Sequence, residues 1–307
     1  MTGADRPRRA AALETSSNRC APHRRSAAPS LLLPWVLFLG AGCTPWEFSL
    51  DECDETCGAG PFFLLDSLEF VQEQPSGLEG FDLDGRSEDC GVDDGTSPSG
   101  AGGVDNQFGS VWDVLPDAVA TVIPVAIETS LQSGAMMVVL ELVGHEDLTG
   151  EGPAGFVLRE GSGDLLVGAD ARPLAGQTID LAPGDNLLGS AETADVEAGA
   201  LHADGLTTLL KLEYIDTQVE FRVVRGRATL TPDGEGGVNL IMGGVVPLDA
   251  VMELVYGLGG DGDANIRAAL EALVPLLVDA RTTPDGACDG ISGAFRGHAV
   301  PTYLFGS

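Results

Sequence analysis

The feature that most constrains the fold of this 307-residue chain is a series of short apolar runs separated by turn signals. In the segment VEFRV at 219–223, apolar and charged residues alternate, which is the period of a strand with one buried face. Pro-Asp-Gly and Pro-Gly-Asp sequences end several of the runs. The expected strands are Phe62–Gln72, Ala135–Val143, Phe156–Arg159, Leu165–Val167, Thr178–Leu181, Leu206–Tyr214, Gln218–Leu230, Val238–Val246 and Gly290–Thr302.

Apolar residues at helical spacing predict a few helices beside these strands. A short helix is expected within Ile123–Leu131, and two more in the C-terminal half, over 248–255 and 266–277. Pro275 lies inside the last of these and should kink or fray it. The fold class is therefore mainly β, an antiparallel β-sandwich or barrel-like sheet with the two C-terminal-half helices packed on it.

The N-terminus predicts export. A basic segment ending at Arg24-Arg25 precedes the apolar run Leu31–Leu39, small residues and then Cys43. The run is too short to span a membrane and is typical of a secretory signal. Residues 1–42 are interpreted as a lipoprotein-type signal peptide, 43–60 as a tether and 61–307 as a single β-rich domain. Cys43 is the expected lipidation site, although leucine stands one position further from the cysteine than in the usual lipobox. An ordinary cleaved signal with a free cysteine is the alternative.

The charge of the mature chain excludes one class of partner. After residue 42 there are 10 basic and 45 acidic residues, a formal charge of −35. Such a chain repels nucleic acids and attracts divalent cations. The expected location is therefore the outer membrane or cell surface, with the membrane contacted through the lipid on Cys43, and any protein or glycan partner is not specified.

Four cysteines remain for disulfides in an oxidising compartment: Cys53, Cys57, Cys90 and Cys288. Four cysteines allow three connectivities. The close spacing of Cys53 and Cys57 favours a local bridge, which leaves Cys90 to pair with Cys288. Zinc is the rival interpretation, but no histidine lies near these cysteines in the sequence, and their spacing matches no common zinc module.

The stretch Gly80–Gly109 is rich in aspartate and glycine, so we expect a structured or ion-bound loop rather than a helix or a regular strand. Carboxylate and amide oxygens at short spacing are the ligands that calcium prefers. The candidate metal ligands are Asp82, Asp84, Asp93, Asp94, Asp105 and Asn106. No complete EF-hand is present, and the alternative is that these residues only cap turns at the surface.

Three motifs give the chain a family resemblance: GFDLDG at 80–85, GGVDNQFG at 102–109 and CDGIS at 288–292. With them, the chain resembles a group of uncharacterised exported lipoproteins of myxobacteria, which share a lipobox, a GFDLDG…GxDN loop, a β-rich middle and a terminal CDxIS strand. The resemblance implies no activity.

No catalytic residue is assigned from the sequence. The chain lacks Gly-x-Ser-x-Gly, His-Glu-x-x-His and phosphate-loop motifs, and His145, His202 and His298 are isolated in the sequence. The expected function is a lipid-anchored envelope protein with a binding or structural role, with calcium as its candidate ion. The alternative is a secreted hydrolase with an acid-based site near the Asp/Gly loop. A folded cleft that joins two or more carboxylates to a histidine would favour the hydrolase.

Overall fold

The computed structural model describes residues 60–86, 88–111, 117–214, 217–259, 268 and 271–305. The chain divides into two units, Met1–Pro45 and Trp46–Ser307, and every described residue belongs to the second. Cys43, Cys53 and Cys57 lie outside the described residues. Among the described residues, no helix combines the length and the apolar character needed to cross a bilayer.

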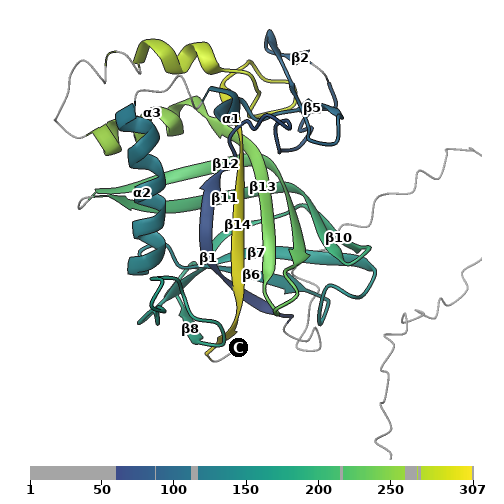
Figure 1. The fold of residues 1–307 in the computed structure, drawn as a ribbon, viewed down its shortest axis with the longest axis vertical. Helices are drawn as coiled ribbons and strands as arrows, with labels where there is room; N and C mark the ends of the chain where they lie inside the picture. The colour runs from purple at the N-terminus through teal and green to yellow at the C-terminus, as the bar shows by residue number, and fades with distance from the viewer. Residues whose placement is uncertain are drawn as a thin grey trace, which may run out of the picture. The chain divides into compact units, whose positions relative to one another are not determined.

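Eight antiparallel strands form a sheet that closes on itself, because the last strand pairs with the first (Figure 1). In their order around the barrel these strands are β1 (Phe62–Phe70), β6 (Val138–Val143), β7 (Gly152–Ser162), β10 (Thr193–Glu197), β11 (Ala200–Tyr214), β12 (Thr217–Pro232), β13 (Val238–Pro247) and β14 (Gly290–Leu304). The expectation of a mainly β, barrel-like fold is confirmed. Eight strands leave an interior that side chains alone can fill.

The interior holds the larger hydrophobic core. Phe70, Phe221 and Phe295 meet at its centre, with ring centroids 4.4–6.1 Å apart. Helix α2 (Asp117–Ser133) packs against β1 and β11 and adds Ile123 and Ile127 to this core. Helix α3 (Leu248–Gly259) packs against β12 and β13, and its Ala250 and Val251 are buried.

A second, smaller core lies on the other face of the sheet. Strand β8 (Thr178–Leu181) pairs with β14 and with β7, and its Ile179 packs with Leu64 and Val139. Neighbouring residues Leu64 and Leu65 of β1 are therefore both buried, on opposite faces. This explains why β1 begins with a continuous apolar run instead of an alternating one.

Two sequence expectations need correction, whereas the expected break near Pro275 is found. Leu165–Val167 is not a strand, since Val167 makes only an isolated bridge to Pro173. Strands β9 (Leu187–Ser190) and β10 were not anticipated. In the expected helix at 266–277, residues 271–273 are helical and the 3-10 helix η3 (Val274–Leu277) follows, because Pro275 has no N–H to continue the α-helical pattern.

The Asp/Gly stretch is ordered, but it does contain short strands. β2 (Glu88–Asp89) pairs with β3 (Val92–Asp93), and β4 (Gly95–Thr96) pairs with β5 (Gly102–Val104). Helix α1 (Gln107–Val111) begins before its end. The expectation that no regular strand forms here is wrong, because two or three residues are enough for each ladder.

The expected disulfide between Cys90 and Cys288 is confirmed, with Cα atoms 5.7 Å apart and a sequence separation of 198 residues. It ties the β2–β3 turn to the segment that leads into β14. Both partners come from polar segments that bury little apolar surface. The covalent bond therefore holds these segments together, as apolar packing does in the barrel.

Removing this bond should lower the free energy of unfolding. The chain-entropy model gives up to about 5 kcal/mol for a loop of this size. We therefore expect Cys90→Ala/Cys288→Ala to show a lower denaturant midpoint than the parent chain, measured by chemical unfolding. Equal midpoints under non-reducing conditions would contradict a stabilising bridge.

Candidate functional site

Three carboxylates converge beside the barrel. Asp82, Asp84 and Asp105 each offer an oxygen atom, and these atoms lie within 4.8 Å of one another. Asp82 and Asp84 belong to the turn before β2, and Asp105 follows β5. Only 6 % of Asp105 is exposed. We call these three residues the acid cluster.

The backbone of the loop brings the acid cluster together. Asp105 N donates to Phe81 O at 2.9 Å, and Leu83 N donates to Asp105 Oδ2. Asp82 Oδ1 accepts from Gly85 N, and Asp84 Oδ1 accepts from Arg86 N. Each carboxylate therefore accepts one backbone hydrogen bond within the loop.

One of the remaining oxygens has no hydrogen-bond partner among the described residues. Asp84 Oδ2 is buried, and no hydrogen bond reaches it from the described residues. A buried carboxylate oxygen without a donor or a cation is costly, because it has lost its water without replacement. A cation at this oxygen would offset that cost.

Two arginines of β12 hold the loop from the barrel side through its carbonyl groups. Arg225 donates to Leu83 O and to Arg281 O, and Arg227 donates to Asp82 O at 2.8 Å. Arg225 has a φ of +52° and lies where the pairing of β12 shifts register. Such a bulge redirects a side chain, here toward the loop.

Buried negative charge accumulates around Asp105. Burial is the largest cause that raises its pKa to about 8, and the charges of Asp94, Asp84 and Asp279 raise it further, against the opposing hydrogen bond from Leu83. Burial also raises the pKa of Asp279 to about 6, although hydrogen bonds from Ser292 oppose it. Asp105 therefore holds a proton near neutral pH unless a cation replaces it.

The other expected ligands have different surroundings. Asn106 is buried and fully hydrogen-bonded: its amide group donates to Val71 O and Glu79 O, and its oxygen accepts from Gly109 N and Ala294 N. Asp93 is exposed on β3. Asp94 lies near enough to raise the pKa values of both Asp105 and Asp279.

Sequence reasoning missed the contribution of Asp279 and Ser292. Both are buried, and Ser292 donates to Asp279 through its backbone N and its hydroxyl. Ser292 Oγ in turn accepts from Gln107 N at 2.9 Å. Ser292 belongs to the CDGIS motif, whose Cys288 was expected to bond Cys90 of the loop, but the sequence did not indicate that Ser292 itself contacts the loop.

His298 was also underestimated. Its Nδ1 lies 2.8 Å from Asp66 Oδ1 and its Nε2 lies 2.9 Å from Asp233 Oδ2. Burial lowers the pKa of His298, but the bonds to Asp233 and Asp66 outweigh it and raise the pKa above its usual value. The imidazolium thus joins β14, β1 and the β12–β13 turn.

His298 lines a cleft of about 440 Å³ together with Asp66, Glu69, Glu128 of α2 and Asp170. This is the combination of carboxylates and a histidine that would favour a hydrolase. Both nitrogens of His298 are already occupied by carboxylates, however, which leaves neither free to accept a proton from a substrate. The geometry is that of a structural ion bridge.

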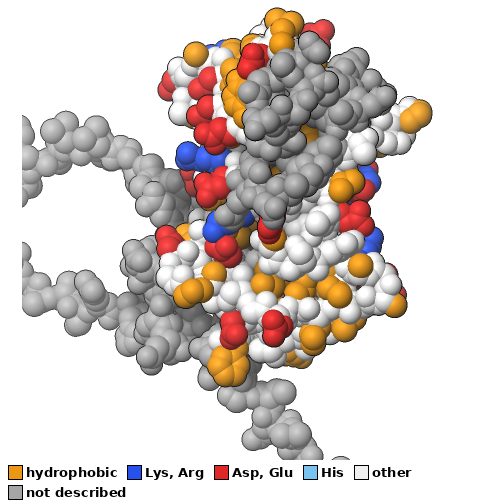
Figure 2. All heavy atoms as spheres, turned by 90° about the vertical axis from the view of Figure 1, so that its left-hand side faces the viewer, with side chains coloured by type: hydrophobic (Ala, Val, Ile, Leu, Met, Phe, Trp, Pro, Cys, Tyr) orange, Lys and Arg blue, Asp and Glu red, His pale blue; other side chains and the backbone are white. Residues whose placement is uncertain are grey.

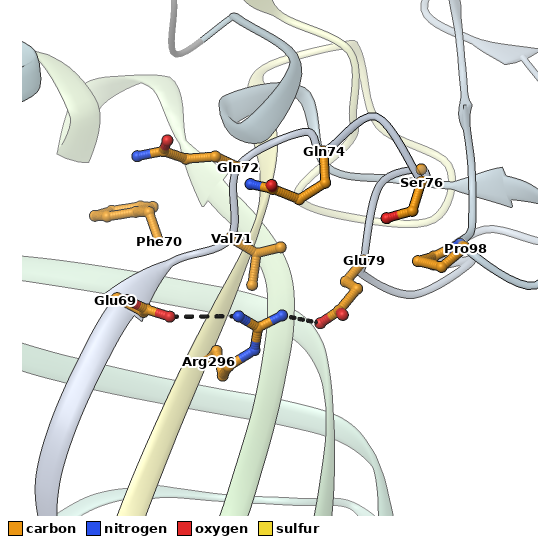
Figure 3. Close-up of a pocket in the computed structure, with 10 residues that line it drawn as sticks. Glu69, Phe70, Val71, Gln72, Gln74, Ser76, Glu79, Pro98 and Arg296 are labelled. Atoms are coloured by element: carbon orange, nitrogen blue, oxygen red, sulfur yellow. Dashed lines mark hydrogen bonds and ion pairs between the residues drawn. The ribbon is translucent and has the colours of Figure 1, made fainter.

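A smaller neighbouring pocket of about 190 Å³ shares Glu69 and Arg296 with this cleft. Figure 3 shows the Arg296 guanidinium between Glu69 and Glu79, and Gln72, Gln74 and Ser76 also line this pocket. Arg296 Nη2 lies 2.5 Å from Glu79 Oε2. Glu69 and Glu79 together neutralise the positive charge of Arg296, so the pocket offers little attraction to an anion.

Comparison with known proteins adds no assignment. No protein-family model matches the chain, and neither the curated proteins nor the solved structures include a significant match.

The His298 bridge predicts a pH dependence of stability. Because the folded pKa is raised, its stabilisation is complete below the unfolded value of 6.5 and disappears as pH rises through the folded pKa. In His298→Gln, this loss of stability above pH 6.5 should be absent. The measurement is thermal unfolding of both chains from pH 5 to 9 in chelator.

Asp105 and Asp279 titrate in an overlapping range, so the informative quantity is the difference between parent and His298→Gln at each pH. A difference that stays constant from pH 5 to 9 would show that His298 is not held as a cation.

Proposed function

We propose that this chain is an exported envelope protein, anchored by lipid on Cys43, with a binding or structural role and a calcium ion bound by the acid cluster. The carrying observation is the buried Oδ2 atom of Asp84, which lacks a hydrogen-bond partner among the described residues and lies beside the buried carboxylate of Asp105. A divalent cation would neutralise both. It would also fix the Asp/Gly loop against β12.

The donor set favours calcium. Only oxygen ligands are present in the acid cluster, as hard cations require. Calcium binds oxygens at about 2.3–2.6 Å, so two of its ligands can lie about 5 Å apart, which accommodates the observed spacing. Backbone carbonyls and water would complete the coordination.

Export and anchoring are supported by the signal-like leader that precedes Cys43. The Cys90–Cys288 bond is consistent with an oxidising compartment. The surplus of acids disfavours nucleic acids as partners, and the resemblance to myxobacterial lipoproteins suggests the same location.

A secreted hydrolase that uses the acid cluster is the alternative. The raised pKa of Asp105 resembles that of a general acid. However, Asp105 is almost completely buried, so an ion can reach its oxygens more readily than a polymer substrate can. Burial therefore favours ion ligation, and we assign no catalytic residue.

Calcium should raise the melting temperature of the mature chain. At 100 times the dissociation constant the gain is about 2.7 kcal/mol. Asp84→Asn should remove most of this gain, because it removes the negative charge of a ligand carboxylate. Asp185→Asn is the matched control, since Asp185 only caps an exposed turn by accepting from Leu187 N. Calorimetric titration and thermal unfolding give the two readouts.

Asp105→Asn separates ion binding from simple capping. The raised pKa of Asp105 means that, without metal, the parent loses stability as pH rises from about 4 to 8. Asp105→Asn should be more stable than the parent at pH 8 in chelator, yet respond less to calcium. Identical melting of the parent in chelator and in millimolar calcium would leave only the turn-capping interpretation.

Lipidation predicts a specific mass. Mature protein extracted from membranes should begin at Cys43 and carry acyl chains, detected by mass spectrometry of the N-terminal peptide. Cys43→Ser should be released into the soluble fraction. A chain cleaved elsewhere, or a Cys43→Ser chain that is still processed at the same site and is fully membrane-bound, would argue against this anchor.

A further inference from the structure

Large apolar side chains are exposed around the C-terminal end of β14. Tyr303 is 66 % exposed and Phe305 is 77 % exposed. The segment before β8 adds Leu166, Val167 and Leu174, each more than 40 % exposed. We call these five residues the terminal patch.

Hydrogen bonds hold the terminal patch as one built surface. Leu174 N donates to Leu166 O, and the Gln177 amide bonds the backbones of both leucines. Tyr303 N donates to Gln177 O, and Phe305 N donates to Ile179 O. In Figure 2, hydrophobic side chains gather across the lower part of the molecule, at the end where Figure 1 places β8 and the end of β14.

The first described residues lie at the same end of the domain. Phe62 at the start of β1 pairs with Thr302, the residue before Tyr303. Gly60 follows Cys43 by 17 residues, so the distance between them is at most about 60 Å. A lipid on Cys43 would therefore confine the barrel to within this reach of the bilayer, where a weak apolar contact becomes effective.

We propose that the terminal patch docks on the zwitterionic lipid surface to which the chain is anchored, an inference that rests on the proposed lipidation of Cys43. Tyr and Phe favour the membrane–water interface. Exposed acids stand beside the patch at Asp164, Asp170 and Asp180, against one base, Arg172. This balance disfavours anionic lipids, so phosphatidylcholine is the matching surface.

The first test measures lipid contact in the lipidated chain. Phe305→Trp in phosphatidylcholine vesicles with brominated lipid should be quenched well beyond the parent chain. Leu276→Trp is the matched control, because Leu276 is 76 % exposed on η3, next to the segment that bridges to the opposite end of β14. Equal quenching of the two variants, or none above the parent, overturns the proposal.

The second test removes the anchor. The Cys43→Ser mature chain should co-sediment with phosphatidylcholine vesicles more than with vesicles rich in phosphatidylglycerol. Tyr303→Ser/Phe305→Ser should lower this partition about tenfold, as expected for partial burial of two aromatic rings, while Leu276→Ser should not. An equal loss in Leu276→Ser overturns the proposal.

The outcomes separate this inference from the anchor itself. If mass spectrometry finds no lipid on Cys43, the proposed anchoring is wrong. The vesicle partition of the unlipidated chain still tests whether the terminal patch binds lipid. If analytical ultracentrifugation shows a dimer that Tyr303→Ser/Phe305→Ser disperses, the patch is a self-association surface and lipid docking is wrong.

Discussion

The pairing of β1 with β14 is the constraint on which the other features depend. It joins the first described strand to the last over Phe62–Phe70 and leaves the eight-stranded ring without a free edge. It also places the backbone of Ala294 against Asn106, and Ser292 against Gln107. A shift of one residue would turn each side chain of β14 to the opposite face and undo both contacts. The irregularity between Leu65 and Ser67 belongs to the same ladder, where Asp66 meets His298.

Strands with one clearly apolar face could be predicted from the sequence. Short strands with small buried residues, and apolar loops, were assigned wrongly. β12 alternates and was recognised. β10 also alternates, but its buried residues are only Ala194 and Val196, too small to stand out between acids. Leu165–Val167 has the composition of a strand, yet it is a loop whose Leu165 packs on the smaller core. The apolar residues of this segment serve other purposes than strand pairing: Leu165 packs on the core, and Leu166 and Val167 belong to the exposed terminal patch.

The residue types of the candidate site could be predicted from the sequence, but which residues come together there could not. The aspartates of the loop were visible, whereas their convergence depends on Asp105 bonding back to Phe81 and Leu83. Asp279 comes from a segment far along the chain. The Asp66–His298 contact spans 232 residues, a distance over which sequence pattern carries no information. The Cys90–Cys288 pairing could be predicted because so few cysteines compete.

Closure by the last strand sets the order in which the molecule can form. Until β14 has been made, β1 and β13 each have one edge without a pairing strand, and Cys90 lacks its disulfide partner. A chain that needs contacts between residues some 230 positions apart folds slowly, since the entropy of closing so long a loop is lost before the contacts form. During synthesis, every shorter intermediate therefore exposes incomplete strands. Under the proposed export, this delay would keep the chain threadable through a narrow translocation channel until β14 has been made.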